Sequence, residues 1–191
     1  MKIDYYIERK SNMKMIWICF ISGFILLFFT IKISITAFTS PDKTVEIKGV
    51  LKEDITIRKG RRGSRTLVIL LKEYPEIKFE IGNIATGKTY VDELMSEKKA
   101  NDSLHFSIEN KEFKSKILKS EKVPFPDNYL RKNTIDILAV HQGSLQYLTL
   151  EDYHEVHQKN RYLMISFFGG LALLMLFAGI KGAQYYKNHY R

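Results

Sequence analysis

Two long apolar runs constrain this sequence more than any other feature. The first reads MIWICFISGFILLFFTI from Met15 to Ile31 and continues after Lys32 with ISITAF, while the second reads YLMISFFGGLALLMLFAGI from Tyr162 to Ile180. About 20 apolar residues, each adding ~1.5 Å of helix, cross a hydrocarbon core about 30 Å thick. Both runs are therefore predicted to be transmembrane helices, over 15–38 and 162–180.

Each run has an alternative interpretation. The first follows basic residues near the N-terminus and could be a cleaved signal peptide, but it is long for the apolar part of such a peptide and no small-residue cleavage pattern follows it. The second could be a buried core helix, which an uncharged run of this length disfavours. Lys32 is compatible with a span because its side chain reaches toward the headgroups.

The net charge of +9 is concentrated outside the middle of the chain. Residues 33–160 carry +2, whereas the two flanks together carry +7. Short tails rich in Lys and Arg stay in the cytoplasm, and long domains cross the membrane largely regardless of charge. This predicts a multi-pass protein of a bacterial cytoplasmic membrane, with both termini cytoplasmic and the middle domain outside. The expected aromatic anchors at the interfaces are Tyr5, Tyr6, Trp17, Tyr185 and Tyr186.

The middle of the chain has the alternation of half-buried strands. Runs at 44–58, 66–72 and 77–81 are expected to form three antiparallel strands, and YVDELMSEKK at 90–99 a helix. A further strand at 103–108, a charged surface loop over 111–122 and a closing hairpin at 134–140 and 145–150 follow. This order is that of a small partly open antiparallel β-barrel of the OB type, and it also suits other small α+β barrels.

A helix is predicted to connect this domain with the second span. Thr149 followed by Asp152 has the spacing of a capping box, and no Pro or Gly interrupts the chain before Gly169. The predicted organisation is therefore a tail (1–14), a span (15–38), an OB-like α+β domain (39–148), a juxtamembrane helix (149–161), a span (162–180) and a tail (181–191).

The stretch GNIATGKT, from Gly82 to Thr89, matches the pattern of phosphate-binding loops. In such a loop the Lys, here Lys88, reaches the outer phosphates, and the hydroxyl, here of Thr89, holds Mg²⁺. That fold requires a parallel sheet and a second strand ending in an Asp, whereas hairpins are predicted here, and the outside of the membrane lacks ATP. The favoured interpretation is structural: Gly82 and Gly87 turn the chain, Thr89 and Asp92 form a capping box, and Lys88 is solvated.

The run RKGRRGSR is the other motif that suggests binding. Its two glycines between apolar strands are typical of a hairpin tip, and a soluble, mutually repelling tip is the simplest interpretation. The functional alternative is contact with anionic lipid headgroups or an acidic surface polymer. The candidate anion-contacting residues are Arg58, Lys59, Arg61, Arg62 and Arg65.

No catalytic, cofactor-binding or metal-binding residues are predicted. His154 and His157 lie three apart on the juxtamembrane helix, but HEVHQ misses the zinc motif because Gln158 stands in place of the second His. These histidines are expected on a solvated face whose protonation responds to pH. Cys19 is the one cysteine, so no intramolecular disulfide is possible, and its place in an apolar run makes it a poor nucleophile.

Small residues four apart occur in both apolar runs. Cys19 with Gly23 and Ser166 with Gly170 have the spacing that lets helices approach closely, within one chain or between copies. Ordinary composition of membrane helices is the alternative explanation.

The segment IKFEIGNI and the juxtamembrane stretch LTLEDYHEVHQKNR resemble those of a family of uncharacterised bacterial membrane proteins. In that family, two transmembrane helices flank a small β-barrel-like extracytoplasmic domain. The resemblance implies the same architecture here and brings no activity or catalytic residues with it.

Three functional hypotheses follow. The leading one is a non-enzymatic envelope protein whose β domain is a binding or assembly module for a protein partner or second copy, a lipid headgroup or a glycan. The second is a nucleotide-binding enzyme that uses Lys88 and Thr89. The third, which requires the reversed orientation, is a cytoplasmic OB-like domain that binds nucleic acid through 58–65; with the domain outside, nucleic acid is disfavoured.

Overall fold

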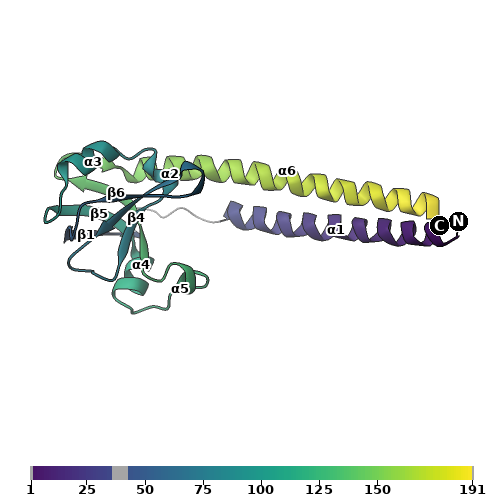
Figure 1. Cartoon of the computed structure of the whole chain (residues 1–191), viewed down its shortest axis with the longest axis horizontal. Coiled ribbons are helices and arrows are strands. Elements are labelled where there is room, and N and C mark those ends of the chain that lie inside the picture. The colour runs from purple at the N-terminus through teal and green to yellow at the C-terminus, as the bar shows by residue number, and fades with distance from the viewer. Residues whose placement is uncertain (1, 36–42, 191) are drawn as a thin grey trace. The chain divides into compact units, whose positions relative to one another are not determined.

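The computed structural model describes residues 2–35 and 43–190, with side chains at 10–35, 43–61 and 63–189 (Figure 1). The chain divides into two compact units. Met1–Ala37 and Lys159–Arg191 form one, here called the helical unit, and Phe38–Gln158 form the other, here called the β unit. The side chains of Tyr5, Tyr6 and Arg62 and the predicted end of the first span, 36–38, lie outside the described residues.

The helical unit consists of α1, Lys2–Ile35, and most of α6, Leu150–Tyr190. Both helices are long and apolar enough to cross a membrane, and 11% of the most apolar window of each is buried within the protein. The core helix of a soluble protein would be mostly buried, whereas here large side chains such as Phe24, Phe28 and Leu173 are more than half exposed. Length and apolarity therefore support two membrane spans.

Glycines allow α1 and α6 to approach each other within the helical unit. A Cβ atom placed on Gly23 would lie 2.9 Å from Leu176, and one on Gly182 would lie 3.0 Å from Ile16. The predicted pair Cys19 and Gly23 thus includes a contact residue, whereas a Cβ on Gly170 would meet nothing within 4 Å. The two helices are antiparallel neighbours (Figure 1).

These contacts predict different effects for one substitution at two glycines. Gly23→Val should destabilise the helix pair by roughly 1–3 kcal/mol, because the new side chain overlaps Leu176. Gly170→Val makes the same chemical change in open space and should leave stability within about 0.5 kcal/mol. Thermal unfolding of the full chain in detergent measures both, and equal melting temperatures would contradict the packing described here.

The β unit contains one mixed sheet of seven strands in the order β1-β5-β6-β4-β3-β2, with β7 paired to β6. The pairs are antiparallel except β4 with β6, which is parallel. The strands are β1 Thr44–Val50, β2 Thr56–Lys59, β3 Arg65–Leu70, β4 Lys78–Ile81, β5 Ser103–Glu109, β6 Thr134–Gln142 and β7 Leu145–Leu148.

Alternating apolar residues place one core against this sheet, as the sequence predicts. Leu104, Phe106 and Ile108 on β5 are fully buried, and their neighbours at 103, 105, 107 and 109 are partly exposed. The rings of Phe79 on β4 and Phe106 lie 4.9 Å apart between centroids and join the two halves of the sheet. Burial of such side chains contributes about 1.5–3 kcal/mol each.

Two features of the predicted barrel need correction. The sheet is not purely antiparallel, because the start of β6 runs parallel to β4, with Phe79 opposite Ile135, before the rest of β6 pairs with β5 in antiparallel register. The predicted strand at 44–58 is also divided into β1 and β2. Leu51 and Ile55 turn into the core between them, and the pairing leaves β1 and β2 as the two ends of an open path.

Short helices fill the connections. A turn of 3-10 helix, Arg61–Gly63, joins β2 to β3, and α2, Asn83–Thr86, and α3, Val91–Glu97, separate β4 from β5. Between β5 and β6 lie α4, Asn110–Glu112, the π-helical η3, Phe113–Ile117, and α5, Asp127–Leu130. The predicted surface loop at 111–122 is therefore largely helical at its start, and it buries Ser115 and Lys116.

The predicted start of the long helix is confirmed. The Asp152 amide donates a hydrogen bond to Thr149 Oγ1 (3.0 Å), and the Thr149 hydroxyl donates one to the Asp152 carboxylate (2.6 Å). From Leu150 the helix is continuous to Tyr190. Its residues up to Gln158 belong to the β unit, where Tyr153 packs against the core.

Candidate functional site

The basic run forms a hairpin, as predicted. Strands β2 and β3 pair so that Lys59 lies opposite Arg65, and Arg61 lies in the turn between them. The side chains of Lys59, Arg61 and Arg65 are exposed. The hairpin therefore presents at least three cations at one end of the sheet.

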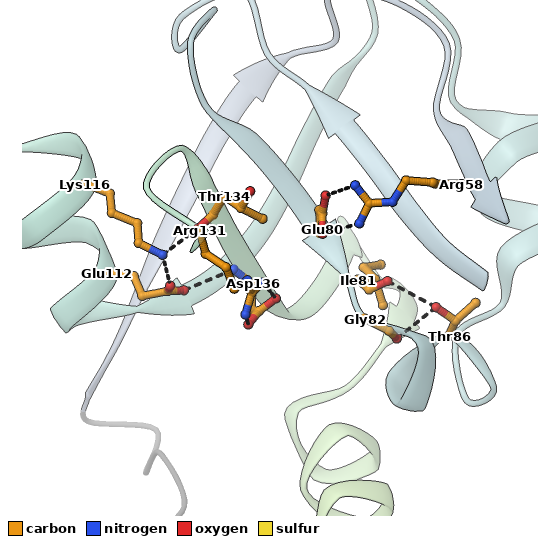
Figure 2. Close-up of polar contacts among 10 residues, drawn as sticks. All are labelled: Arg58, Glu80, Ile81, Gly82, Thr86, Glu112, Lys116, Arg131, Thr134 and Asp136. Carbon is orange, nitrogen blue, oxygen red and sulfur yellow. Dashed lines mark hydrogen bonds and ion pairs between the residues drawn. The ribbon is translucent and has the colours of Figure 1, made fainter. Parts of the chain in front are cut away.

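Arg58 differs from the other basic residues. Its guanidinium lies 3.1 Å from both carboxylate oxygens of Glu80 on β4, a residue that is 6% exposed (Figure 2). A buried carboxylate without a cation would be strongly destabilising, so Arg58 acts as a structural counterion. Sequence reasoning missed this pair, because Glu80 looks like an ordinary polar residue of an alternating strand.

The hairpin and the GNIATGKT stretch line one cleft, here called the hairpin cleft. The Arg65 amide donates a hydrogen bond to Asn83 Oδ1 (2.8 Å), which attaches the start of β3 to α2. The cavity beside this contact has a volume of about 380 Å³. It is lined by Ile57, Gly63, Arg65, Asn83, Thr86, Gly87, Thr89, Tyr90, Val91, Asp92 and Glu93.

The cleft combines three kinds of recognition chemistry. Arg65 supplies a cation, Asp92 and Glu93 supply carboxylates, and the Tyr90 ring is 61% exposed. An exposed aromatic face stacks on flat or ring-shaped ligands, while the charged groups accept or donate hydrogen bonds. Sequence reasoning missed the cleft because β3 and α2–α3 are separated by the whole of β4.

Several polar groups of GNIATGKT form hydrogen bonds within the protein. The Thr86 amide donates to Gly82 O (3.0 Å) and the Lys88 amide to Ala85 O (2.9 Å). The buried Thr89 hydroxyl donates to Ala85 O at 3.0 Å, and the N-cap of α3 is Tyr90 without a side-chain cap bond, so the predicted capping box of Thr89 with Asp92 is wrong. Tyr90 occupies the position before α3 instead, since Thr89 completes the turn after α2.

Lys88 is paired rather than simply solvated. Its Nζ lies 3.1 Å from Glu155 Oε2, and this hydrogen bond raises the pKa of Lys88. Both side chains are 42% exposed, so the pair adds little stability. A phosphate-binding loop needs its amides, Lys and hydroxyl directed at the ligand, and in this conformation they have partners within the β unit.

A second polar cluster, here called the buried ion network after its buried Lys116, lies between η3 and β6 (Figure 2). Arg131 and Asp136 at its edge are 40% and 34% exposed. Lys116 Nζ donates to Glu112 Oε1 and to Thr134 O, each at 2.5 Å. The other oxygen of Glu112 accepts the Asp136 amide at 3.0 Å, and Arg131 donates two hydrogen bonds to the Asp136 carboxylate (2.8 and 2.6 Å). Two cations thus balance two carboxylates.

Burial has the largest effect on the pKa of Glu112, and a hydrogen bond has the largest effect on that of Arg131. Burial raises the pKa of Glu112, although the hydrogen bond from Lys116 acts in the opposite direction. The hydrogen bond to Asp136 raises the pKa of Arg131. A cavity of about 240 Å³ adjoins the network. The charged groups of the network are already paired with one another. We therefore assign the network to holding the β5–β6 connection onto the sheet.

The buried ion network predicts a large effect for one lysine and a small effect for its neighbour. The Lys116 side chain is 2% exposed, so Lys116→Ala leaves Glu112 buried without its cation and should cost about 3–5 kcal/mol. Lys114 is 46% exposed and lies 3.8 Å from Glu121, so Lys114→Ala should cost less than about 1 kcal/mol. Denaturant unfolding of the full chain in detergent measures both, and similar losses would count against the network.

The two juxtamembrane histidines are not both on a solvated face. The His157 ring stacks on Tyr153 with centroids 4.2 Å apart, and burial lowers the pKa of His157 from its ordinary value of 6.5. Burial likewise raises the pKa of the Tyr153 phenol. Among the described residues, no group of three or more His, Cys, Asp or Glu side chains could hold a metal ion.

The lowered pKa of His157 predicts a pH-dependent stability. Because the unfolded chain binds this proton more readily, the free energy of unfolding should decrease as the pH falls below about 6.5 and level off below the folded-state pKa. His157→Gln should make this decrease smaller. Thermal unfolding between pH 7.5 and about pH 5 tests it, and an unchanged pH profile in the variant would contradict the assignment.

Comparisons with known protein families and with curated proteins gave no match to this chain.

Proposed function

We propose that this chain is a non-enzymatic, membrane-anchored binding module whose β unit is an OB-like domain. If β1 and β2 are two halves of one bent strand, the path β1-β5-β6-β4-β3-β2 contains five strands that return to the first. An isolated bridge between Leu51 and Leu71 next to the bend supports this view. Helices between the third and fourth of these strands complete the arrangement of a small, partly open barrel.

We place this protein in a bacterial cytoplasmic membrane with both termini in the cytoplasm. The support is the distribution of charge, since the flanks hold most of the net positive charge while the β unit is nearly neutral. The β unit then lies outside the cytoplasm, between the two spans in sequence.

The proposed ligand is an acidic glycan whose anionic groups contact the hairpin cations Lys59, Arg61 and Arg65, while its hydroxyl groups donate hydrogen bonds to the carboxylates of Asp92 and Glu93 in the cleft. The observation that carries this proposal is the junction of the cationic hairpin with an exposed aromatic ring, because Arg65 and Tyr90 line one cavity. Lys59 and Arg61 extend the positive charge beyond the cavity. Aromatic stacking with cationic hydrogen-bond donors suits a chain of sugar rings that carries carboxylate or sulfate groups, and OB-type folds bind oligosaccharides through such loops.

A nucleotide-binding enzyme is the less favoured alternative. It would require the bonds of Thr89 to Ala85 and of Lys88 to Glu155 to break before a phosphate and Mg²⁺ could bind. A nucleic-acid-binding module would use the same cations of the hairpin, but it would require the β unit to be cytoplasmic.

Glycan binding is testable with the full chain in nanodiscs passed over immobilised heparin as a model acidic glycan. Arg61→Ala with Arg65→Ala should weaken binding at least about tenfold, because charge-assisted hydrogen bonds are lost. Tyr90→Ala should also weaken it through lost stacking. Binding should decrease with added salt, and neutral dextran should not compete.

The matched control is Lys48→Ala with Lys52→Ala, which removes two exposed cations outside the hairpin. This pair should retain wild-type affinity apart from a small general charge effect. An equal loss in both double variants, or none in either, would contradict the hairpin cleft as the glycan site. Binding of Mg-ATP that Lys88→Ala abolishes would favour the nucleotide alternative instead.

A further inference from the structure

A second surface of the β unit exposes large apolar side chains. Phe125, Tyr129 and Leu130, here called the α5 patch, are 85%, 86% and 71% exposed. They lie on α5 and the residue before its N-cap, Pro126. In Figure 1, α5 lies on a chain excursion beside the sheet of the β unit rather than over its core. The patch is separate in sequence from the hairpin cleft.

The chain holds this patch in an ordered shape. The amides of Tyr129 and Leu130 both donate hydrogen bonds to Pro126 O at 3.0 Å, and the Arg131 amide donates to Asp127 O at 3.0 Å. The Arg131 side chain is fixed by its two hydrogen bonds to Asp136. The patch therefore lies on a hydrogen-bonded turn, and the bonds of Arg131 to Asp136 attach this turn to β6.

Leaving three such side chains in water forgoes a substantial hydrophobic stabilisation. Large apolar side chains are stabilised by leaving water, and groups of exposed apolar side chains mark interaction sites. Phe125 and Leu130 have no polar group to satisfy in their side chains. An apolar environment outside the β unit is the simplest explanation for their position.

The charged residues near the α5 patch indicate what kind of apolar environment it contacts. Lys119, Lys122 and Lys132 are exposed and flank the patch in sequence. Of the acidic residues near the patch in sequence, Glu121 is paired with Lys114 at 3.8 Å, and Asp127 in the first turn of α5 is the one carboxylate between Lys122 and Lys132, so the three lysines outnumber it. Aromatic and leucine side chains bordered by lysines are the chemistry of segments that enter the headgroup region of a membrane, where anionic lipids attract the lysines.

We propose that the α5 patch binds the anionic lipid surface of the membrane that carries α1 and α6. Phe125 and Leu130 enter the boundary between headgroups and acyl chains, the Tyr129 hydroxyl stays at headgroup level, and the three lysines contact lipid phosphates. This contact depends on the membrane location of the protein but not on its glycan ligand. It adds a third point of membrane attachment to the two spans.

Tryptophan fluorescence tests this proposal, because Trp17 is the one tryptophan of the chain. In a Trp17→Phe background, Phe125→Trp places a single reporter in the patch. The full chain is reconstituted in nanodiscs of phosphatidylcholine and phosphatidylglycerol, with and without bromine on the acyl chains. Bromine quenches nearby indoles, so the Trp introduced at 125 should lose about half of its emission in the brominated discs.

Tyr90→Trp in the same background is the matched control, since Tyr90 is an exposed aromatic residue of the hairpin cleft. Its emission should be insensitive to brominated lipid. Changing Lys119, Lys122 and Lys132 to Gln together should reduce the quenching at 125, and so should discs of phosphatidylcholine alone. Circular dichroism of each variant confirms that the fold is retained.

An emission at 125 that brominated lipid leaves unchanged would overturn the proposal. If that emission instead shifted to shorter wavelength with increasing protein per disc, the patch would bind a second copy of the chain, which also overturns the lipid assignment. Heparin binding is measured separately at the hairpin, so failure of one proposal leaves the other intact.

Discussion

Most apolar side chains of α1 and α6 are exposed on the surface of the protein and are not buried within it. A helix satisfies its own backbone hydrogen bonds, so such a surface is stable in lipid and unfavourable in water. The helices contact each other where glycines permit it, at Gly23 and Gly182. Because van der Waals packing and not the hydrophobic effect drives helix association in lipid, these close approaches define the pair.

Charge compensation organises the β unit in a similar way. Arg58 neutralises Glu80, and Arg131 and Lys116 neutralise Asp136 and Glu112. The charged residues in these pairs are already bound to one another and are less available to a ligand. The exposed surface includes a cationic hairpin beside an aromatic cleft and an apolar patch bordered by lysines. Basic residues that the sequence does not distinguish therefore have different surroundings: Arg58 and Lys116 neutralise carboxylates, whereas Lys59 and Arg61 are exposed.

The sequence was sufficient for features that depend on local pattern. The two apolar helices, the strand alternation around Phe106, the hairpin of Arg61 and the cap at Thr149 were all predictable from spacing and composition. Contacts between distant segments were not. The burial of Lys116, the parallel pairing of β4 with β6 and the meeting of Arg65 with Tyr90 depend on strand order. The capping box at Thr89 failed because α3 begins one residue later than the spacing requires, with Tyr90 as its N-cap.

The side of the membrane on which the β unit lies is the central claim, and cysteine labelling tests it most directly. With Cys19→Ser as background, Ser144→Cys places one thiol in the exposed turn between β6 and β7, and Asn188→Cys places one near the end of α6. A membrane-impermeant maleimide applied to intact bacterial cells should label the cysteine at 144 and reach the one at 188 after lysis. Labelling at 188 but not at 144 in intact cells would contradict the account.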